Sequence, residues 1–500
     1  MRFLDNTLYR KKNESADNEK DDSIKDYKNL EIKSKEKKDF LTALSGKSLY
    51  DLCKENEKEN ESLLVWPHSF QDCKDELKDK HILDCTFNGK DIETLRTGNL
   101  IGYIGSKKVQ LEIRSRFSSE DNSSDPFLYY LLSKVFDVNI VDMKHGKGEL
   151  DGIDLLIFMF SGLLKDSMRQ GVFKQYVRKK YNDTNLRGTI DITRHIRYNY
   201  PPNGHIAYNT REYSYDNDIT QLIRHTIEHV ERNKIGKVIL AADKDVAECV
   251  RIIKQYTPTY NKSERRKVMI NNSRPVNHPY FTRYKSLQKL CLALLRGDKV
   301  SHGAEKDKIY GLLIDIAWLW EEYLAKLLAE TKFRHCTSRR EFHLFQKENK
   351  SLQAVVPDYR YAVVPDYLYK AENDEKRKYI IADAKYIPLH KYKKLNEERV
   401  LTVYYKTIMY MYRFHTDLGF LFHPVEAQEN NSESILVNSY KIDNGRNCYL
   451  HEIGIMIPAK KNKSDNIKSI KEYREEFEKN EIDFVEKVKE LVDESKDPSS

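Results

Sequence analysis

Apolar and polar residues alternate along the chain from about residue 62 to residue 117, which is the pattern of half-buried β-strands. The stretches HILDCTF, NLIGYIG and KKVQLEIRSRF carry this alternation, and Asn88-Gly89 is a turn signal after the first of them. In the third stretch Val109 and Leu111 fall on one face of the strand and Gln110 falls on the other. The pattern therefore predicts a β-rich segment.

The pattern changes to helical spacing from about residue 126 to residue 300. Apolar residues recur three and four positions apart in DPFLYYLLSKVFDV and in DLLIFMFSGLLKDSMRQGVFKQYVRKKY. The most apolar part, IDLLIFMFSGLL, is too short to cross a bilayer and predicts a core helix. Gly188, within NLRGTIDITRHI, predicts a bend into a strand.

From about residue 309 the order of patterns is helix, strand, hairpin, helix and strand, which predicts an α/β module ending near Pro458. Its first helix is expected over IYGLLIDIAWLWEEYLAKLLAE. At about 100° per residue, Glu321 lies at the edge of the apolar face of that helix and Glu322 faces water. The last 40 residues carry an amphipathic stripe that predicts one or two helices packed on another element.

A chain of 500 residues with 39% hydrophobic and 33% charged residues is long enough for several globular domains. We expect a multidomain protein in which N-terminal β-rich and helical regions precede an α/β domain. The expected parts are a charged tail, disordered or loosely helical, then a β-rich and helical region, an α/β domain and a helical tail, over 1–60, 61–300, 301–460 and 461–500.

Charge and cysteine content narrow the classes of function. The formal net charge of +8 is mild, so it permits a nucleic-acid partner without requiring one. The seven cysteines are scattered and form no CxxC pair, which argues against a zinc site or a disulfide framework. No apolar segment follows Met1. A reducing cytoplasm is the expected compartment, with no membrane partner.

Candidate chemistry lies in VVPDYRYAVVPDYLYKAENDEKRKYIIADAKY, at positions 355 to 386, which contains the pentapeptide VVPDY twice. A carboxylate-type nuclease needs oxygen ligands for Mg²⁺ or Mn²⁺ and a nearby cation that stabilises developing charge. The PD…DxK pattern of Asp366, Asp383 and Lys385 supplies these groups, and residues two apart on a strand share a face. A solvated hairpin with incidental charges is the alternative.

Strand pairing distinguishes the two PDY copies. A hairpin turn centred near Asp374 places Asp366 almost opposite Asp383, and opposite residues of paired strands lie about 5 Å apart. Asp358 lies eight positions earlier, or about 26 Å along an extended strand. We therefore predict that Asp366 belongs to the site and that Asp358 does not.

Two helices are expected to add further groups to this site. Glu321 can lean into a cleft beside the core, although a solvated side chain is the alternative. In NEERVLTVYYKTIMYMYRF, Lys406 and Tyr410 are four residues apart and share a helix face, from which they could hold the scissile phosphate. An aromatic core helix is the alternative for this segment.

In combination these stretches resemble the McrC/LlaJI family of restriction components over roughly residues 95 to 425. The resemblance rests on LIGYIGSKKVQLEIRSRF, YVRKKYNDTNLRGTIDITRHI, LLIDIAWLWEEYLAKLL, VPDYLYK…YIIADAKY and LGFLFHP. It implies a PD-(D/E)xK endonuclease with Glu321, Asp366 and Asp383 as metal ligands and with Lys385 and Lys406 as further catalytic residues. Lys406 departs from the family pattern, which often has Gln at that position.

The resemblance also implies a partner, a McrB-like AAA+ GTPase hexamer, which uses GTP while this chain cuts DNA. Residues 61–300 would then be the partner-docking and DNA-contact region, and residues 301–460 the nuclease domain. The stretch ALSGKS is an incomplete phosphate-binding loop, because Leu41 stands where the pattern needs Gly. A cluster of basic residues could contact DNA phosphates or an acidic partner: Arg178, Lys179, Lys180, Arg187, Arg194 and Arg197. The rival hypotheses are a non-catalytic adaptor of the GTPase and a stand-alone DNA-repair nuclease.

Overall fold

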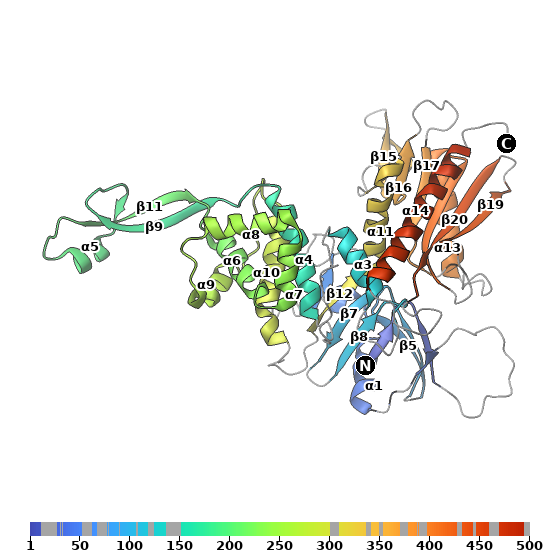
Figure 1. Ribbon diagram of the computed structural model, residues 1–500, viewed down its shortest axis with the longest axis horizontal. Coiled ribbons are helices and arrows are strands. Elements are labelled where there is room, and N and C mark those ends of the chain that lie inside the picture. Colours follow the sequence, from blue (N-terminus) through green and yellow to red (C-terminus); the bar gives the residue numbers. More distant parts are fainter. Residues whose placement is uncertain are drawn as a thin grey trace. The chain divides into compact units, whose positions relative to one another are not determined.

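The computed structural model describes most of the chain in two compact units, one formed by residues 1–135 with 305–500 and the other by residues 136–304. The described residues are 1–11, 28–30, 32, 34–52, 63–67, 78, 80–89, 91–106, 109–118, 125–136, 152–300, 310–336, 342–349, 354–370, 379–387, 389, 398–427, 433–443, 447–459 and 470–494. Mixed sheets and helices make this a multidomain α/β protein (Figure 1).

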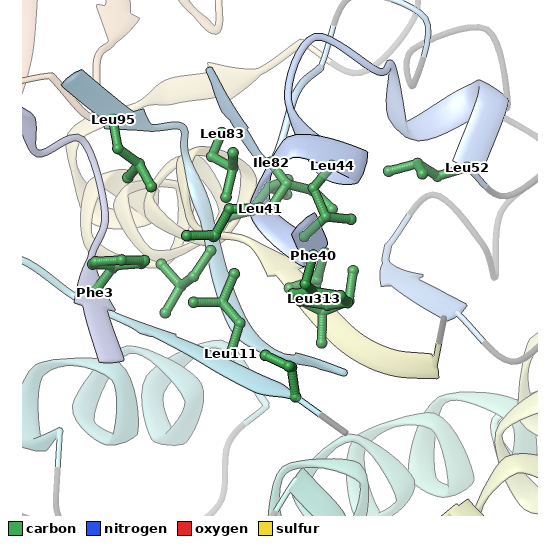
Figure 2. Packing of buried hydrophobic residues seen from close by; sticks show 14 of the residues in the cluster. Phe3, Phe40, Leu41, Leu44, Leu52, Ile82, Leu83, Leu95, Leu111 and Leu313 are labelled. Atoms are coloured by element: carbon green, nitrogen blue, oxygen red, sulfur yellow. The ribbon is translucent and has the colours of Figure 1, made fainter. Parts of the chain in front are cut away.

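Two sheets and a helix build the N-terminal part of the first unit. The five-stranded sheet contains, in order, β1 (Arg2–Leu4), β8 (Gln110–Arg114), β7 (Leu100–Gly105), β12 (Tyr310–Asp315) and β4 (Leu63–Trp66). The four-stranded sheet contains β3 (Lys28–Asn29), β2 (Leu8–Arg10), β6 (Asp91–Thr97) and β5 (Leu83–Asn88). Helix α1 (Lys35–Leu44) inserts Phe40, Leu41 and Leu44 into the core that these elements share (Figure 2).

The expected strands between residues 83 and 114 are therefore present, whereas the charged tail expected over residues 1–60 is wrong for the described part of that segment. Strand β1 pairs in parallel with β8, and Phe3 on β1 lies in the same core as α1. The reason is that short apolar groups stand among the charged residues of this segment. A few apolar residues are enough to form a short strand or helix here, because the sheet on which they pack is built from residues far away in the sequence.

The first expected helix of the α/β module is also only half correct, because Tyr310–Asp315 within it form strand β12. This strand pairs with both β4 and β7. Its neighbour Gly102 has φ +135°, and a Cβ atom there would lie 2.1 Å from the Leu312 carbonyl oxygen. The helix begins only after Asp315, whose side chain accepts hydrogen bonds from the first-turn amides. Glycine thus permits the close strand approach, and the cap sets the boundary.

A six-stranded sheet forms the C-terminal part of the first unit. Its order is β13 (Phe333–His335), β16 (Tyr367–Lys370), β17 (Tyr379–Ala384), β18 (Leu418–Glu426), β20 (Cys448–Ile457) and β19 (Ile435–Ile442). The neighbouring helices are α3 (Pro126–Val135), α11 (Ile316–Leu327), α13 (Glu398–Phe414) and α14 (Ile470–Glu494), and η3 (Leu328–Thr331) is a 3-10 turn. Strands β17, β18 and β20 run parallel.

Helices α13 and α14 cover opposite faces of this sheet. Leu421 lies in a core cluster with Val403 and Met411 of α13, whereas the ring of its neighbour Phe422 contacts Phe484 of α14. Successive residues of a strand point to opposite faces, which accounts for this division. The C-terminal amphipathic stripe thus forms one helix that packs on the sheet, as expected.

The second unit combines helices with a three-stranded antiparallel ribbon. Its helices are α4 (Gly152–Met168), α5 (Ile192–Asn199), α6 (Asp218–Val230), α7 (Lys234–Ala242), α8 (Lys244–Tyr256), η2 (Lys262–Glu264), α9 (Arg265–Asn271) and α10 (Tyr284–Val300). The ribbon contains β10 (Thr189–Ile190), β11 (Ile206–Ser214) and β9 (Gln175–Asp183). With α5 it projects from the helices of its unit (Figure 1). No helix in the described ranges is long and apolar enough to cross a membrane.

The expectation that YVRKKY continues a helix is wrong, because these residues lie in β9. The side chains of β9 alternate between exposed and half-buried along its whole length. Strand β11 pairs with all nine residues of β9. Pairing with residues 23 to 39 positions further along the chain therefore overrides the local helical spacing.

Candidate functional site

Two aspartates meet where β16 and β17 pair. Tyr367 is the partner of Ala382 in this antiparallel register, so Asp366 stands opposite Asp383, as the hairpin geometry predicted. The Ala384 amide donates a hydrogen bond of 2.7 Å to Asp366 Oδ2. The residues of the expected turn, 371–378, lie outside the described part of the chain.

The other PDY copy lies in a different sheet. Asp358 is in β15 (Ala354–Ala362), which pairs with β14 (His343–Asn349) and places Asp358 opposite Phe345. These two strands form their own two-stranded sheet. The structure thus separates Asp358 from the strand pair that carries Asp366 and Asp383.

Lys385 is next to both aspartates. Its Nζ lies 2.5 Å from Asp383 Oδ2 and 3.6 Å from Asp366 Oδ2. Burial by itself lowers the pKa of Lys385, but the Asp383 and Asp366 carboxylates raise it more, so the net shift is upward. Lys385 therefore stays protonated and keeps a positive charge between two acidic groups.

Asp383 is the most buried of the acidic groups, with 1% of its side chain exposed. Burial, and next the Asp366 charge, raise the pKa of Asp383 to about 7, against the opposing effect of Lys385. Its Oδ2 forms the ion pair with Lys385. Burying this carboxylate beside a second acidic group costs folding free energy.

We expect Asp383→Asn to be more stable than the wild type at high pH when measured in EDTA. A carboxyl whose pKa is raised on folding contributes stability below its unfolded pKa of about 4 and loses that stability as the pH rises through about 7. The substitution removes this penalty. The free energy of unfolding should therefore differ by on the order of 2 kcal/mol at pH 8 and by little at pH 4. Denaturant titrations at several pH values measure it, and a difference that does not vary with pH would contradict the assignment.

Glu321 is held by a histidine that the sequence did not reveal as part of the site. It lies on α11 in the first unit, and its Oε1 is 2.8 Å from Nε2 of His335, at the end of β13. Burial alone lowers the pKa of His335, but Glu321 raises it, so the net shift is upward. The stretch FRHC around His335 matches no known motif. The pairing of β13 with β16 is what places His335 beside Asp366.

The helical wheel indicated that Glu322 faces water, but its side chain is not fully exposed. It is half-buried, and burial raises the pKa of its carboxyl. The charges of His335 and Lys326 oppose that rise. The helical wheel places this side chain opposite the apolar face of its own helix, but it does not show the strand that lies beside the helix.

Helix α13 brings one of its two expected groups to the site. Lys406 is exposed, whereas Tyr410 is half-buried. Burial and the Asp383 charge raise the pKa of Tyr410, and the charges of Lys385 and Asp366 also act on it. Tyr410 is therefore the residue of this helix that faces the carboxylates, and Lys406 points to solvent.

A buried polar cluster fastens α13 to the sheet. The Tyr404 hydroxyl of α13 donates to Glu452 Oε2 at 3.0 Å, and the Tyr440 hydroxyl donates to the same oxygen at 3.1 Å. The other oxygen of Glu452 lies 3.1 Å from His423 Nε2, and neither side chain is exposed. The cluster fixes Tyr404, six residues before Tyr410 on the same helix.

The described side chains include no group of three His, Cys, Asp or Glu residues already arranged to hold a metal ion. Asp366 and Asp383 are adjacent, but Glu321 points to His335 instead of completing a set of three. Two carboxylates still match Mg²⁺, which commonly takes one or two together with several waters. The pair therefore suits such an ion, and Glu321 does not join it in this arrangement.

The stretch around Gly46 does not form a phosphate-binding loop. It follows helix α1, whereas such a loop follows a strand. This agrees with the interpretation made from Leu41.

Apolar side chains are exposed between β9 and β11, at the end of the ribbon of the second unit. These residues, here called the apolar tip, are Leu186, Ile190, Ile192, Ile196, Tyr198 and Tyr200. In the same segment Asn199 is buried, and Arg194 Nη2 donates to the Tyr181 carbonyl at 2.6 Å. Exposed apolar residues make the apolar tip a candidate interaction site.

The basic residues expected to act as one cluster are divided by their contacts. Arg178 and Lys180 are exposed on the ribbon, and Lys179 forms an ion pair of 3.1 Å with Glu212. Arg187 pairs with Asp183 at 3.3 Å. Arg197, which stands 5.7 Å over the Tyr198 ring, and Arg194 belong to α5.

Comparison with known proteins gives one family. A model of the McrBC 5-methylcytosine restriction system component matches residues 95–424. No curated protein matches the chain. Among solved structures, a half-complex of Thermococcus gammatolerans McrB AAA+ hexamers with bound McrC has 14% identity and a TM-score of 0.41, covering 96% of this chain and 99% of the other. A T. gammatolerans McrBC complex has 14% identity and a TM-score of 0.30, with 67% and 89% coverage.

Proposed function

Because this chain belongs to the family of McrBC 5-methylcytosine restriction system components, we propose that it is the DNA endonuclease subunit of such a system. The observation that carries the proposal is the position of Lys385 Nζ, 2.5 Å from Asp383 and 3.6 Å from Asp366. A structural ion pair has no need of a second carboxylate that raises the pKa of the first. A phosphodiester-cleaving centre needs both.

The proposed cofactor is Mg²⁺, with Mn²⁺ as a substitute, held by Asp366 and Asp383. The repulsion between the two adjacent carboxylates, which raises the pKa of Asp383, favours a divalent cation between them. When bound, such an ion makes a water molecule more acidic and neutralises charge on a phosphate oxygen.

The residues of the chain then have separate tasks. Lys385 holds a positive charge where the phosphate gains negative charge, and its position is fixed by two carboxylates. The Tyr410 hydroxyl remains protonated, because burial and neighbouring acids raise its pKa, and it can donate a hydrogen bond to the phosphate. Glu321 orients His335 from the adjoining helix, within reach of the Asp366 charge.

The two PDY copies provide a matched pair of variants. Asp366→Asn should lower DNA cleavage by on the order of a hundredfold or more, because it removes one of two acidic oxygen ligands. Asp358→Asn should keep cleavage within a few-fold of the wild type, since β15 does not pair with β17. The measurement is plasmid cleavage with Mg²⁺ and the partner GTPase. Loss of activity in Asp358→Asn with retention in Asp366→Asn would reverse the assignment.

The proposed partner is a McrB-like AAA+ GTPase, which uses the GTP. The apolar tip supports contact with a protein partner, because DNA phosphates offer no apolar surface to Ile192 and Ile196. DNA is the proposed substrate of the other unit. A non-catalytic adaptor would also bind the GTPase, but it would not lose a nuclease activity when Asp366 is replaced.

A further inference from the structure

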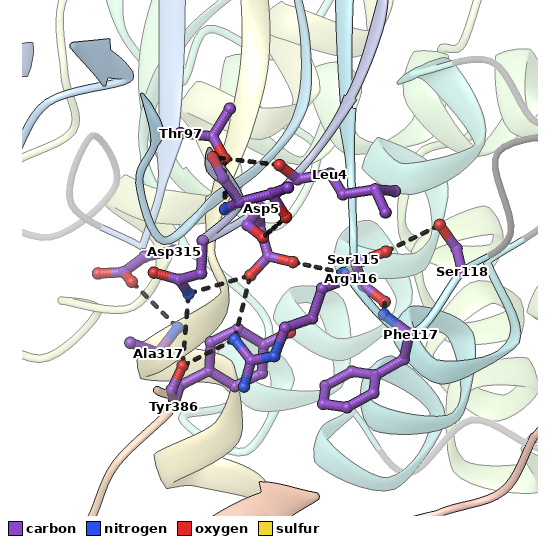
Figure 3. A network of polar contacts seen from close by, with 12 residues as sticks. Leu4, Asp5, Thr97, Ser115, Arg116, Phe117, Ser118, Asp315, Ala317 and Tyr386 are labelled. Carbon is purple, nitrogen blue, oxygen red and sulfur yellow. Dashed lines mark hydrogen bonds and ion pairs between the residues drawn. The ribbon is translucent and has the colours of Figure 1, made fainter. Parts of the chain in front are cut away.

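The residue that follows Lys385 is anchored to a different sheet. Tyr386 is buried, and its carbonyl oxygen accepts a hydrogen bond of 3.1 Å from Arg116 Nη1. The Asn6 side-chain amide reaches the same oxygen at 3.4 Å. Arg116 and Asn6 follow the ends of β8 and β1, two neighbouring strands of the five-stranded sheet. Figure 3 shows Arg116 between Tyr386 and Asp5.

Arg116 is itself held by contacts on several sides. Its guanidinium carbon lies 4.3 Å from the centre of the Tyr386 ring and 4.8 Å from that of Phe117. Its Nη1 is 3.8 Å from Asp5 Oδ2, and its amide donates to Asp5 Oδ1 at 2.5 Å. Planar guanidinium groups combine ring stacking with directed hydrogen bonds in a way that lysine does not.

Asp5 completes this anchor. It has no exposed surface, and its own amide donates to the Arg114 carbonyl at 2.8 Å. Burial raises the pKa of Asp5 to about 6, although the Arg116 charge and the Arg116 amide lower it. The carboxyl is therefore ionised at neutral pH and balances the guanidinium charge.

These contacts fix the backbone on both sides of the Lys385 side chain. On one side the Lys385 amide donates to the Phe422 carbonyl at 2.8 Å, within the six-stranded sheet. On the other side the Tyr386 carbonyl is fixed by Arg116. The position of Lys385 Nζ between two carboxylates thus depends on a residue of another sheet, one that the sequence led us to expect on a docking surface.

We propose that Arg116, oriented by Asp5, is a positioning residue for Lys385 in the nuclease centre. This inference rests on the proposed function. Displacing a reacting group by about 1 Å can cost on the order of a hundredfold in rate. Arg116 acts through the backbone of Tyr386. Loss of the Arg116 side chain should therefore slow the chemical step without raising the dissociation constant for DNA.

The test compares Arg116→Ala, Arg116→Lys and Arg114→Ala in the full chain with its GTPase partner. Arg114 is a matched control, because it is also buried at the end of β8 and its ion pair of 2.6 Å is with Glu112 of its own strand. Single-turnover cleavage at saturating DNA should fall by about a hundredfold in Arg116→Ala, with the DNA dissociation constant unchanged. Arg116→Lys keeps the charge beside Asp5 but loses the planar donor group and the ring stacking, so it should recover only a small part of the loss.

Hydrogen exchange of the amides from Ala384 to Ile387 separates this inference from the proposed function. These amides should exchange faster in Arg116→Ala, while those of β20 stay protected as in the wild type. If the wild type cuts no DNA but the exchange changes as stated, the nuclease function fails and the anchor stands. Wild-type cleavage rates in Arg116→Ala, unchanged exchange, or an equal loss in Arg114→Ala would overturn the inference.

Discussion

Asp383→Asn should abolish Mg²⁺-dependent DNA cleavage, with a loss on the order of a thousandfold or more. Asp383 is the buried member of the acidic pair, and its Oδ2 lies 2.5 Å from Lys385 Nζ. The amide of Asn has no charge, so it neither attracts a divalent cation nor fixes the lysine ammonium. The measurement is cleavage of DNA by the purified chain with its GTPase partner, at a fixed GTP and Mg²⁺ concentration.

The same variant should still stimulate GTP hydrolysis by the partner, which provides the internal control. Asp383 lies in the first unit of the chain, whereas the apolar tip lies in the second. Normal stimulation of GTP hydrolysis together with absent DNA cleavage would show that the variant is folded and has lost only its nuclease activity. Cleavage at the wild-type rate by Asp383→Asn would remove the nuclease assignment.

The strand pair that carries Asp366 and Asp383 could be predicted from the sequence because its signals are local. The apolar strand patterns on either side of a polar stretch predict one register, and the structure pairs Tyr367 with Ala382 as that register requires. Asp366 and Asp383 follow from this pairing alone. The spacing between Asp383 and Lys385 then places the lysine on the same side.

Features formed by distant residues could not be predicted in this way. Strand β12 has the spacing of a helix and becomes a strand only because β4 and β7 pair with both its edges. Arg116 and Tyr386 are 270 positions apart, and no pattern in either segment indicates their contact. His335 likewise enters the site only through the pairing of β13 with β16. Nonlocal strand pairing therefore accounts for most of the differences between the sequence predictions and the structure.

Ile192→Asp combined with Ile196→Asp should abolish association with the GTPase partner and the stimulation of its GTP hydrolysis. Both side chains are more than 60% exposed, so replacing them removes no part of the protein's own core. An interface centred on them would instead have to bury two carboxylates without partners. Truncating or charging central interface residues commonly costs 2 kcal/mol or more each, so the dissociation constant should rise on the order of a thousandfold.

Arg178→Ala with Lys180→Ala is the matched control, because these residues are also exposed on the ribbon but carry positive charge instead of an apolar side chain. A protein contact through the apolar tip predicts a large loss for the isoleucine pair and a small, salt-dependent loss for the basic pair. Contact with DNA through the ribbon predicts the reverse order, because phosphates respond to positive charge. Association measured by sedimentation velocity at two salt concentrations distinguishes these outcomes, and an unaffected isoleucine variant would assign the partner surface elsewhere.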